Sequence, residues 1–118
     1  MKKKLIDGLT ACGFVEGKTN FLQGTINPEA TYPETFTTIW TNDTAETVHY
    51  DNGAQAVAWY FGVNLYSSNP AIVNEKPKEI IATLRARGFI PQGRGRDIPS
   101  DEPTHTGWAM EFVYIEKL

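Results

Sequence analysis

An acidic segment near the C-terminal end is the first place where the residue types suggest chemistry. Its four candidate side chains are Asp97, Asp101, Glu102 and His105. Carboxylate oxygens of this kind can hold a divalent cation. The spacing matches neither a calcium-binding loop nor a zinc site, and Pro99 and Pro103 favour a rigid extended segment. We therefore predict that this segment holds no metal and no other cofactor.

A second candidate is a thiol nucleophile, formed by Cys12 with His49 or His105. A neighbouring imidazole can activate a cysteine for covalent catalysis. Cys12, however, ends an apolar helical pattern, where a free cysteine usually serves as a small buried hydrophobe. We predict that the chain is not an enzyme.

The run Gly93-Arg94-Gly95-Arg96 carries two arginines between glycines. Such runs can cradle phosphates or track RNA. This one occurs once and follows no strand-to-helix turn, so an exposed flexible loop explains it equally well. Contact of Arg94 and Arg96 with nucleic acid stays open as an alternative.

Two helices position these groups, one over about 3–12 and one over about 70–87. Asn69 suits an N-cap and Pro70 the first helical position, whereas Pro77 predicts a kink or a break. Both helices end on a Gly-Phe pair, Gly13-Phe14 and Gly88-Phe89, each four or five residues after a leucine. The spacing predicts a Schellman cap at both ends.

Between and after the helices, apolar residues alternate with a period of two. The alternation predicts strands over 35–41, 47–50, 54–66 and 107–116, with Asp51-Asn52-Gly53 as the turn of a hairpin. The strand over 54–66 would span about 40 Å at 3.3 Å per residue, which is long for so small a domain. The segments 16–34 and 91–106 show no clear periodicity and are predicted to be irregular. The fold class is therefore α+β, in the order α-β-β-β-α-β: an antiparallel or mixed sheet of four to five strands with both helices on one face.

The second face of this sheet is unusual for a face that meets water. The last predicted strand is apolar on both sides, and the long strand presents small residues together with Tyr60, Asn64 and Tyr66. Two explanations stay open: a second packed layer or rolled sheet, and an interface between subunits.

The length and composition of the chain limit its number of domains and its class of function. The chain has 118 residues, one cysteine and a formal net charge of −3. These values predict a single domain over 1–118 that folds in a reducing cytoplasm and is not built around binding phosphates. Lysines follow Met1, but Asp7, Gly8 and Gly13 interrupt the apolar stretch after them, so we expect neither a secretory signal nor a membrane span.

Three pairs of segments carry a resemblance to a known family. They are 36–43 (FTTIWTND) with 49–52 (HYDN), 65–70 (LYSSNP) with 87–91 (RGFIP), and 95–107 (GRDIPSDEPTHTG) with 114–116 (YIE). Together they extend over roughly 31–117, and they resemble the tail-completion, or tail-terminator, proteins of long-tailed phages and prophages of Gram-positive hosts. The first thirty residues are less distinctive.

The resemblance implies a virion structural protein without enzymatic activity. Such proteins form a ring, usually of six copies, on the last disc of the tail tube; the ring stops polymerisation and offers a surface for head joining. The implied partners are further copies of the chain, the tail tube protein and a head connector or head-completion protein, with DNA only passing through and no membrane. The implied location is the tail neck of the virion, after assembly in the host cytoplasm. The candidate interface residues are then Arg94, Arg96, Asp97, Asp101, Glu102 and His105 in the loop and Tyr60, Asn64 and Tyr66 on the strand.

Three other readings stay open. The chain could be a different neck component, such as a head-completion protein or connector adaptor, or a small nucleic-acid-binding module that uses Arg94, Arg96 and the N-terminal lysines. The third reading is a small hydrolase or metal protein that uses the Asp-Glu-His loop. A chain that lacks 93–104 is expected to fold but to fail in capping tails.

Overall fold

The two helices end as their sequences predict. α1 (Lys2–Ala11) and α2 (Pro70–Ala86) are each followed by a glycine in the left-handed region, with φ of 97° at Gly13 and 95° at Gly88. The amide of Phe14 donates to the carbonyl of Leu9 at 3.0 Å, and the amide of Phe89 donates to Leu84 at the same distance. These are the long bonds of two Schellman caps, so each helix is tied to the segment that follows it.

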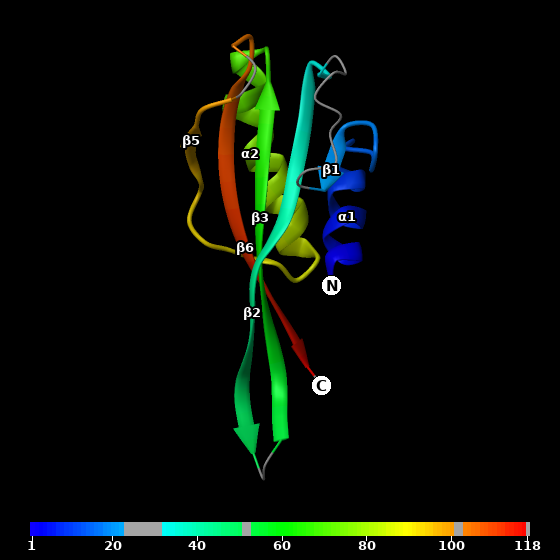
Figure 1. Ribbon diagram of the computed structural model, residues 1–118, viewed down its shortest axis with the longest axis vertical. Coiled ribbons are helices and arrows are strands. Elements are labelled where there is room, and N and C mark those ends of the chain that lie inside the picture. Colours follow the sequence, from blue (N-terminus) through cyan, green and yellow to red (C-terminus); the bar gives the residue numbers. More distant parts are fainter. Residues whose placement is uncertain (23–31, 51–52, 101–102, 118) are drawn as a thin grey trace.

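The computed structural model describes residues 1–22, 32–50, 53–100 and 103–117, and Figure 1 shows their arrangement. Within these residues, two helices pack against one mixed sheet of six strands, in the order β1-β2-β3-β6-β4, with β5 also pairing with β6. The strands are β1 (Asn20–Leu22), β2 (Thr35–Tyr50), β3 (Gly53–Ser67), β4 (Ile90–Pro91), β5 (Arg96–Ile98) and β6 (Thr106–Lys117). β1 runs parallel to β2, and every other pair is antiparallel. The α+β class is confirmed.

The strand count and order differ from the prediction in two ways. The strands expected over 35–41 and 47–50 are one continuous strand, β2, whose register shifts near Thr41 and again near Val48. These irregularities interrupt the alternation and hide the continuity. Tyr50 pairs with Gly53, as the predicted hairpin requires, while the turn residues Asp51 and Asn52 lie outside the described residues.

The other difference is that three short strands occur in segments predicted to be irregular. β1 lies within 16–34, β5 lies within 91–106, and β4 begins one residue before the second of these segments. Strands of two or three residues are too short for an alternation to be visible, because pairing with β2 or β6 defines them rather than their own pattern. The sheet therefore has six strands where four to five were expected.

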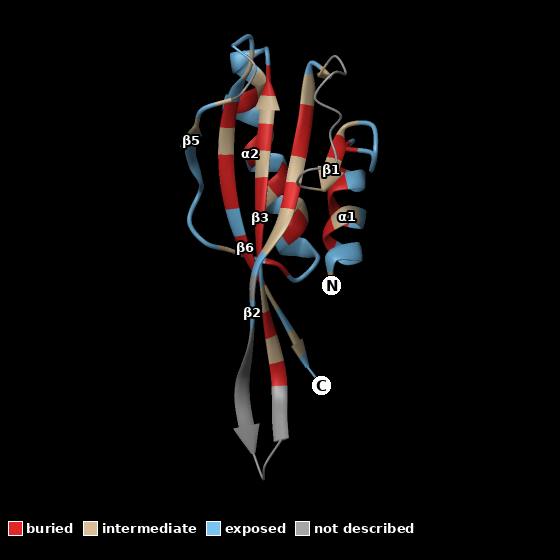
Figure 2. Cartoon of the chain, in the orientation of Figure 1, coloured by how far each residue is buried: buried red, intermediate tan, exposed pale blue. Residues whose placement is uncertain are grey.

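The hydrophobic core lies between the helices and one face of the sheet. Phe61 lies opposite Phe112 and Val63 opposite Met110 in the β3–β6 register. One cluster joins these side chains to buried residues of both helices, including Leu5, Leu9, Ile80 and Leu84. Figure 2 shows this buried band along the middle of the sheet. Both helices therefore cover the same face, as predicted.

Pro77 does not break α2. The helix is continuous from Pro70 to Ala86, and Pro77 is buried within it. Of the predicted kink or break, the break is wrong, because burial on the core-facing side compensates for the missing backbone hydrogen bond, and the kink stays a prediction. The predicted N-cap is confirmed: the Asn69 side chain accepts a 3.0 Å hydrogen bond from the amide of Ala71.

The molecule is elongated, with principal extents of 54 × 27 × 23 Å. Figure 1 shows why: the β2–β3 hairpin continues well beyond the helices at the lower end of the view. We call residues 42–50 of β2 and 53–60 of β3 the arm. On the outer edge of β2, β1 pairs only with Thr37–Ile39, so β1 does not reach the arm. β6 pairs with the base of the arm from Tyr60 to Ala56, so only the far part of the hairpin, 49–50 with 53–55, is a two-stranded ribbon.

Candidate functional site

The face of the sheet that the helices leave uncovered carries all three strand-face candidates. Tyr60, Asn64 and Tyr66 lie opposite Val113, Ala109 and Gly107 in the register. They alternate with the core residues Phe61, Val63 and Leu65, so they point to the opposite side. Neither helix and no strand among the described elements packs over this side, which we call the open face.

Small residues on the open face make room for large rings. A Cβ atom on Gly62 would lie 2.3 Å from the Trp40 ring, and one on Gly107 would lie 2.8 Å from the Tyr66 ring. Trp40 and Tyr66 therefore lie flat across the backbone of the neighbouring strand. The amide of Asn64 donates to the Tyr66 hydroxyl at 3.0 Å. The aromatic rings of this face are held in place by the strands they cross.

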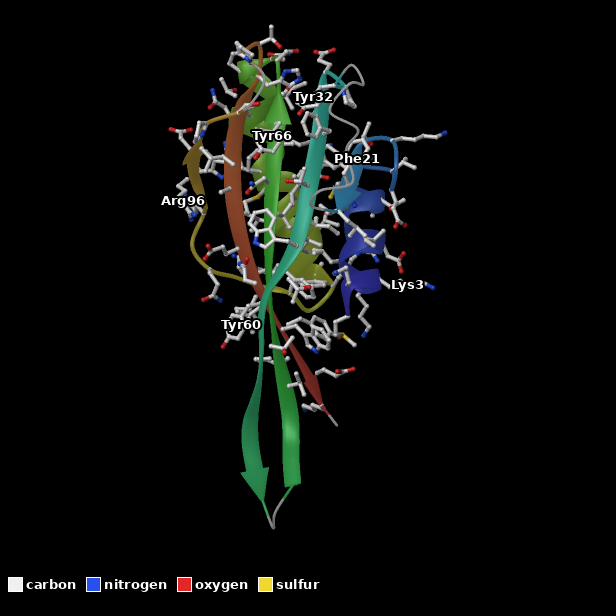
Figure 3. All side chains as sticks on the ribbon, in the orientation of Figure 1. Lys3, Phe21, Tyr32, Tyr60, Tyr66 and Arg96 are labelled. Carbon is white, nitrogen blue, oxygen red and sulfur yellow. The ribbon has the colours of Figure 1, made fainter. Side chains whose placement is uncertain are left out.

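One end of the open face is an aromatic cluster centred on Phe36. The Phe36 ring stacks on Tyr66 at 5.2 Å and meets Tyr32 at 5.4 Å, Phe21 at 6.0 Å and His105 at 5.8 Å, measured between ring centroids. Although Phe36 is on the uncovered side, it is only 2% exposed. Figure 3 shows Tyr32 and Tyr66 at this end and Tyr60 far from them, at the base of the arm.

His105 belongs to this cluster. Its Nε2 lies 2.8 Å from the Pro33 carbonyl oxygen and its Nδ1 lies 3.0 Å from the Thr104 hydroxyl. The contact with the carbonyl requires a protonated Nε2, which donates the hydrogen bond to Pro33. The imidazole thus ties the segment before β6 to the segment before β2.

The base of the arm carries a second, more exposed apolar patch. Tyr60 is 37% exposed and Ile115 is 41% exposed. They lie on the same face as diagonal neighbours, because Tyr60 pairs with Val113 and Ala58 pairs with Ile115. Side chains at such diagonal positions are within contact range. Ile115 was not among the predicted site residues, although its place two residues after Val113 in an alternating strand indicates this face.

The loop candidates separate onto different surfaces. Arg96 reaches over the open face, where its guanidinium lies 3.6 Å from the carboxylate of Glu111, and both side chains are exposed. Asp97 pairs with Trp108 in the register and is also exposed. Asp101 and Glu102 lie outside the described residues. The predicted loop site is therefore not one constellation within the described chain.

Arg94 lies on the other side of the sheet, beside α2. It lines a cleft of about 450 Å³ together with Gly93, Trp108 and the α2 residues Val73, Asn74, Pro77, Lys78, Ile81 and Arg85. The indole N–H of Trp108 donates to the Arg94 carbonyl at 2.8 Å. Sequence patterns did not indicate this cleft, because it depends on where the loop after β4 folds back against α2.

The described candidates for a thiol nucleophile and its base do not lie together. Cys12 is 4% exposed and belongs to the core cluster, while His105 is engaged with Pro33 and Thr104. The side chain of His49 lies outside the described residues. Among the residues that the structure describes, no three His, Cys, Asp or Glu side chains are grouped in a way that could hold a metal ion. Nor is any described helix long and apolar enough to cross a membrane.

The fold and these surfaces define an α+β protein with one face of its sheet covered by helices, the other uncovered, and a hairpin projecting beyond both. No protein-family model matches the chain, and no curated protein matches it. The open face, the arm and the cleft are therefore the features of the described residues that bear on function.

Proposed function

We propose that this chain is a virion structural protein that caps the head-proximal end of a phage tail tube as a ring of identical copies. The ring, of six copies, ends tube polymerisation and presents the surface to which the head is joined. The segments within 31–117 that resemble tail-completion proteins support this role. They include β2, the exit of β3 and the segment from β5 into β6.

The observation that carries the proposal is the arm. The far part of the arm has only two strands, and a two-stranded ribbon is marginally stable in water. An exposed strand edge also invites pairing with another chain. β1 pairs with β2 only up to Ile39, and the exposed patch of Tyr60 and Ile115 lies at the base of the arm. A subunit in a ring gains contacts for such an arm, whereas a lone globular domain does not.

A ring also requires two different surfaces on each subunit, joined head to tail. The arm and the open face lie at one end and on one side of the molecule, whereas the helices cover the other side. The chain thus presents unlike surfaces in different directions. In the proposed ring, surfaces that point in different directions bind the tube protein on one side and the head connector on the other.

The nucleic-acid alternative receives less support. Arg94 lies beside α2, and Arg96 lies over the open face with Glu111 as its ion-pair partner. The two arginines are therefore not on one phosphate-binding surface. In our proposal, DNA passes through the ring without being gripped.

The test is the mass of the purified chain by light scattering over a wide concentration range, with electron microscopy of concentrated samples. Closed rings of six subunits that bind purified tail tubes at one end are expected. Tyr60→Ser removes an exposed ring from the base of the arm and should weaken ring formation, while Tyr60→Phe serves as the matched control. A chain that neither forms rings nor binds tail tubes contradicts the proposal.

A further inference from the structure

The cleft beside α2 is a binding surface that the open face and the arm do not explain. Its floor is apolar and is formed by Val73, Pro77, Ile81 and Trp108. The charged residues that line it, Lys78, Arg85 and Arg94, are all basic. An apolar floor with cations along its rim suits an extended segment that carries apolar side chains and carboxylates.

The cleft is held in shape by its own chain. The indole N–H of Trp108 fixes the Arg94 carbonyl at 2.8 Å. The next residue, Gly95, has φ of 98°, and a Cβ atom there would lie 2.3 Å from the indole nitrogen. A glycine is therefore required for the loop to approach Trp108 this closely. A preformed wall lowers the entropic cost of binding.

The basic side chains that line the cleft are largely available to pair with a partner's acidic groups. Lys78 pairs with Glu75 at 3.5 Å, with both side chains largely exposed. Within the described residues, neither Arg85 nor Arg94 takes part in an ion pair. Exposed arginines beside an apolar surface are well suited to pairing with the carboxylates of a partner.

Charge is segregated along the sequence, and the arm lies in the acidic part. The chain has no Lys or Arg between Lys18 and Lys76, although the sequence has 11 such residues in total. The acidic residues in that interval are Glu29, Glu34, Asp43, Glu46, Asp51 and Glu75. Asp43 and Glu46 belong to β2, within the arm. The chain therefore carries both a basic cleft and an acidic projection.

We propose that the cleft of one copy binds the arm of the next copy. From Val73 to Arg85, α2 rises about 18 Å, which matches about five residues of an extended strand. The arm cannot reach the cleft of its own chain, because it leads away from α2 (Figure 1) and is held to β6 as far as Ala56. Since the arm and the cleft are different surfaces, the contact is head-to-tail and closes into a ring if the rotation permits.

This inference rests on the proposed function and names the contact that holds the ring together. Its test is charge reversal with compensation. Arg85→Glu with Arg94→Glu should weaken self-association by about tenfold or more, because like charges would then face each other. Asp43→Lys with Glu46→Lys should do the same. All four changes in one chain should restore association to near the original level.

Lys2→Glu with Lys3→Glu is the matched control, since it makes the same change in net charge on the exposed side of α1 and should leave association unchanged. Circular dichroism of each variant confirms folding. If the Arg85 and Arg94 reversal weakens association no more than the control does, or if the four changes together do not restore it, the arm–cleft contact is wrong. Rings that persist in that case leave the proposed function standing on another interface.

A cross-linking experiment covers the case in which the free chain stays monomeric until it meets a tail. Thr44→Cys places a thiol on the arm and Asn74→Cys places one at the cleft, while the native Cys12 is buried. Oxidising a concentrated mixture of the two variants, one of them enlarged by a tag, should yield the mixed dimer beyond its statistical share. If the two dimers of like variants and the mixed dimer form in statistical proportions, the inference is wrong. If the mixed dimer is enriched but no rings form, the arm–cleft contact is supported, and the free chain does not form rings without a tail.

Discussion

Phe61 and Tyr60 are neighbours on β3, yet they belong to two different kinds of surface. Phe61 is fully buried under the helices, while Tyr60 is 37% exposed on the open face. The covered face is filled by aliphatic and phenyl side chains that interdigitate with α1 and α2. The open face carries rings with polar groups, such as Tyr60, Tyr66 and Trp40, and two of these rings, Tyr66 and Trp40, lie across glycines.

This difference separates stability from interaction. Side chains of the covered face lose nearly all contact with water on folding, so they supply most of the hydrophobic stabilisation. Rings with a polar edge, placed on a rigid sheet, keep their ability to contact a partner and lose little entropy on doing so. Substitutions on the two faces should therefore affect different measurements.

The largest expected effect comes from replacing the two neighbours in turn. Phe61→Ala should lower the free energy of unfolding by about 3–5 kcal/mol, because it leaves a cavity in the core. Tyr60→Ala should lower it by less than about 1 kcal/mol, since much of its ring is already in water. Urea unfolding followed by circular dichroism measures both. Equal losses for the two variants would contradict the division into a stabilising and an interacting face.

A second substitution tests the packing of rings over glycines. Gly62→Val should cost about 1–3 kcal/mol, because its side chain would occupy the space of the Trp40 ring. In the background of Trp40→Leu the same change should cost clearly less, since the ring that it displaces is gone. The double-mutant cycle measures this coupling. Additive effects would mean that Gly62 is required for a reason other than Trp40.

The sequence predicted the features that depend on local patterns. The Gly-Phe stops, the Asn69 cap and the long alternation around Phe61 each involve residues close in the chain, and the structure confirms them. The pairing of β1 with β2 and the cleft that Arg94 lines together with α2 join segments that are distant in sequence and carry no periodicity. Such features follow from tertiary packing, so local reasoning could not predict them.

The candidate site residues of the loop over 91–106 also show that local sequence patterns do not predict tertiary placement. Its residues were grouped because they are close in sequence, but Arg94 and Arg96 lie on different sides of the sheet. β5 pairs with β6 inside the segment whose deletion was expected to be harmless to folding. Removing 93–104 would also remove the hydrogen bond from Trp108 to Arg94. Point substitutions are therefore sharper tests of function than the deletion.

A third substitution examines the aromatic cluster of the open face, whose central residue Phe36 is buried. His105→Ala should cost about 1–2 kcal/mol, because it removes the contact with the Pro33 carbonyl and the packing against Phe36. Thr104→Ala is the control, since its hydroxyl is exposed and should contribute less. Thermal unfolding measures both. A negligible effect of His105→Ala would place the aromatic cluster with the interacting surface rather than with the stabilising one.

The smallest expected effect concerns Arg96 on the open face. Its ion pair with Glu111 spans 3.6 Å between side chains that are 67% and 48% exposed. Pairs that are this accessible to water contribute little, so Arg96→Ala should change the free energy of unfolding by less than about 0.5 kcal/mol. Urea unfolding in low and high salt checks this, with Glu111→Ala as the matched partner variant. A loss well above 1 kcal/mol that persists in high salt would show that the arginine stem packs on the sheet, and the open face would then share in stabilising the single chain. If Arg96→Ala weakens self-association but leaves the free energy of unfolding unchanged, Arg96 takes part in contacts between copies. This is the role that we expect for a residue of the open face.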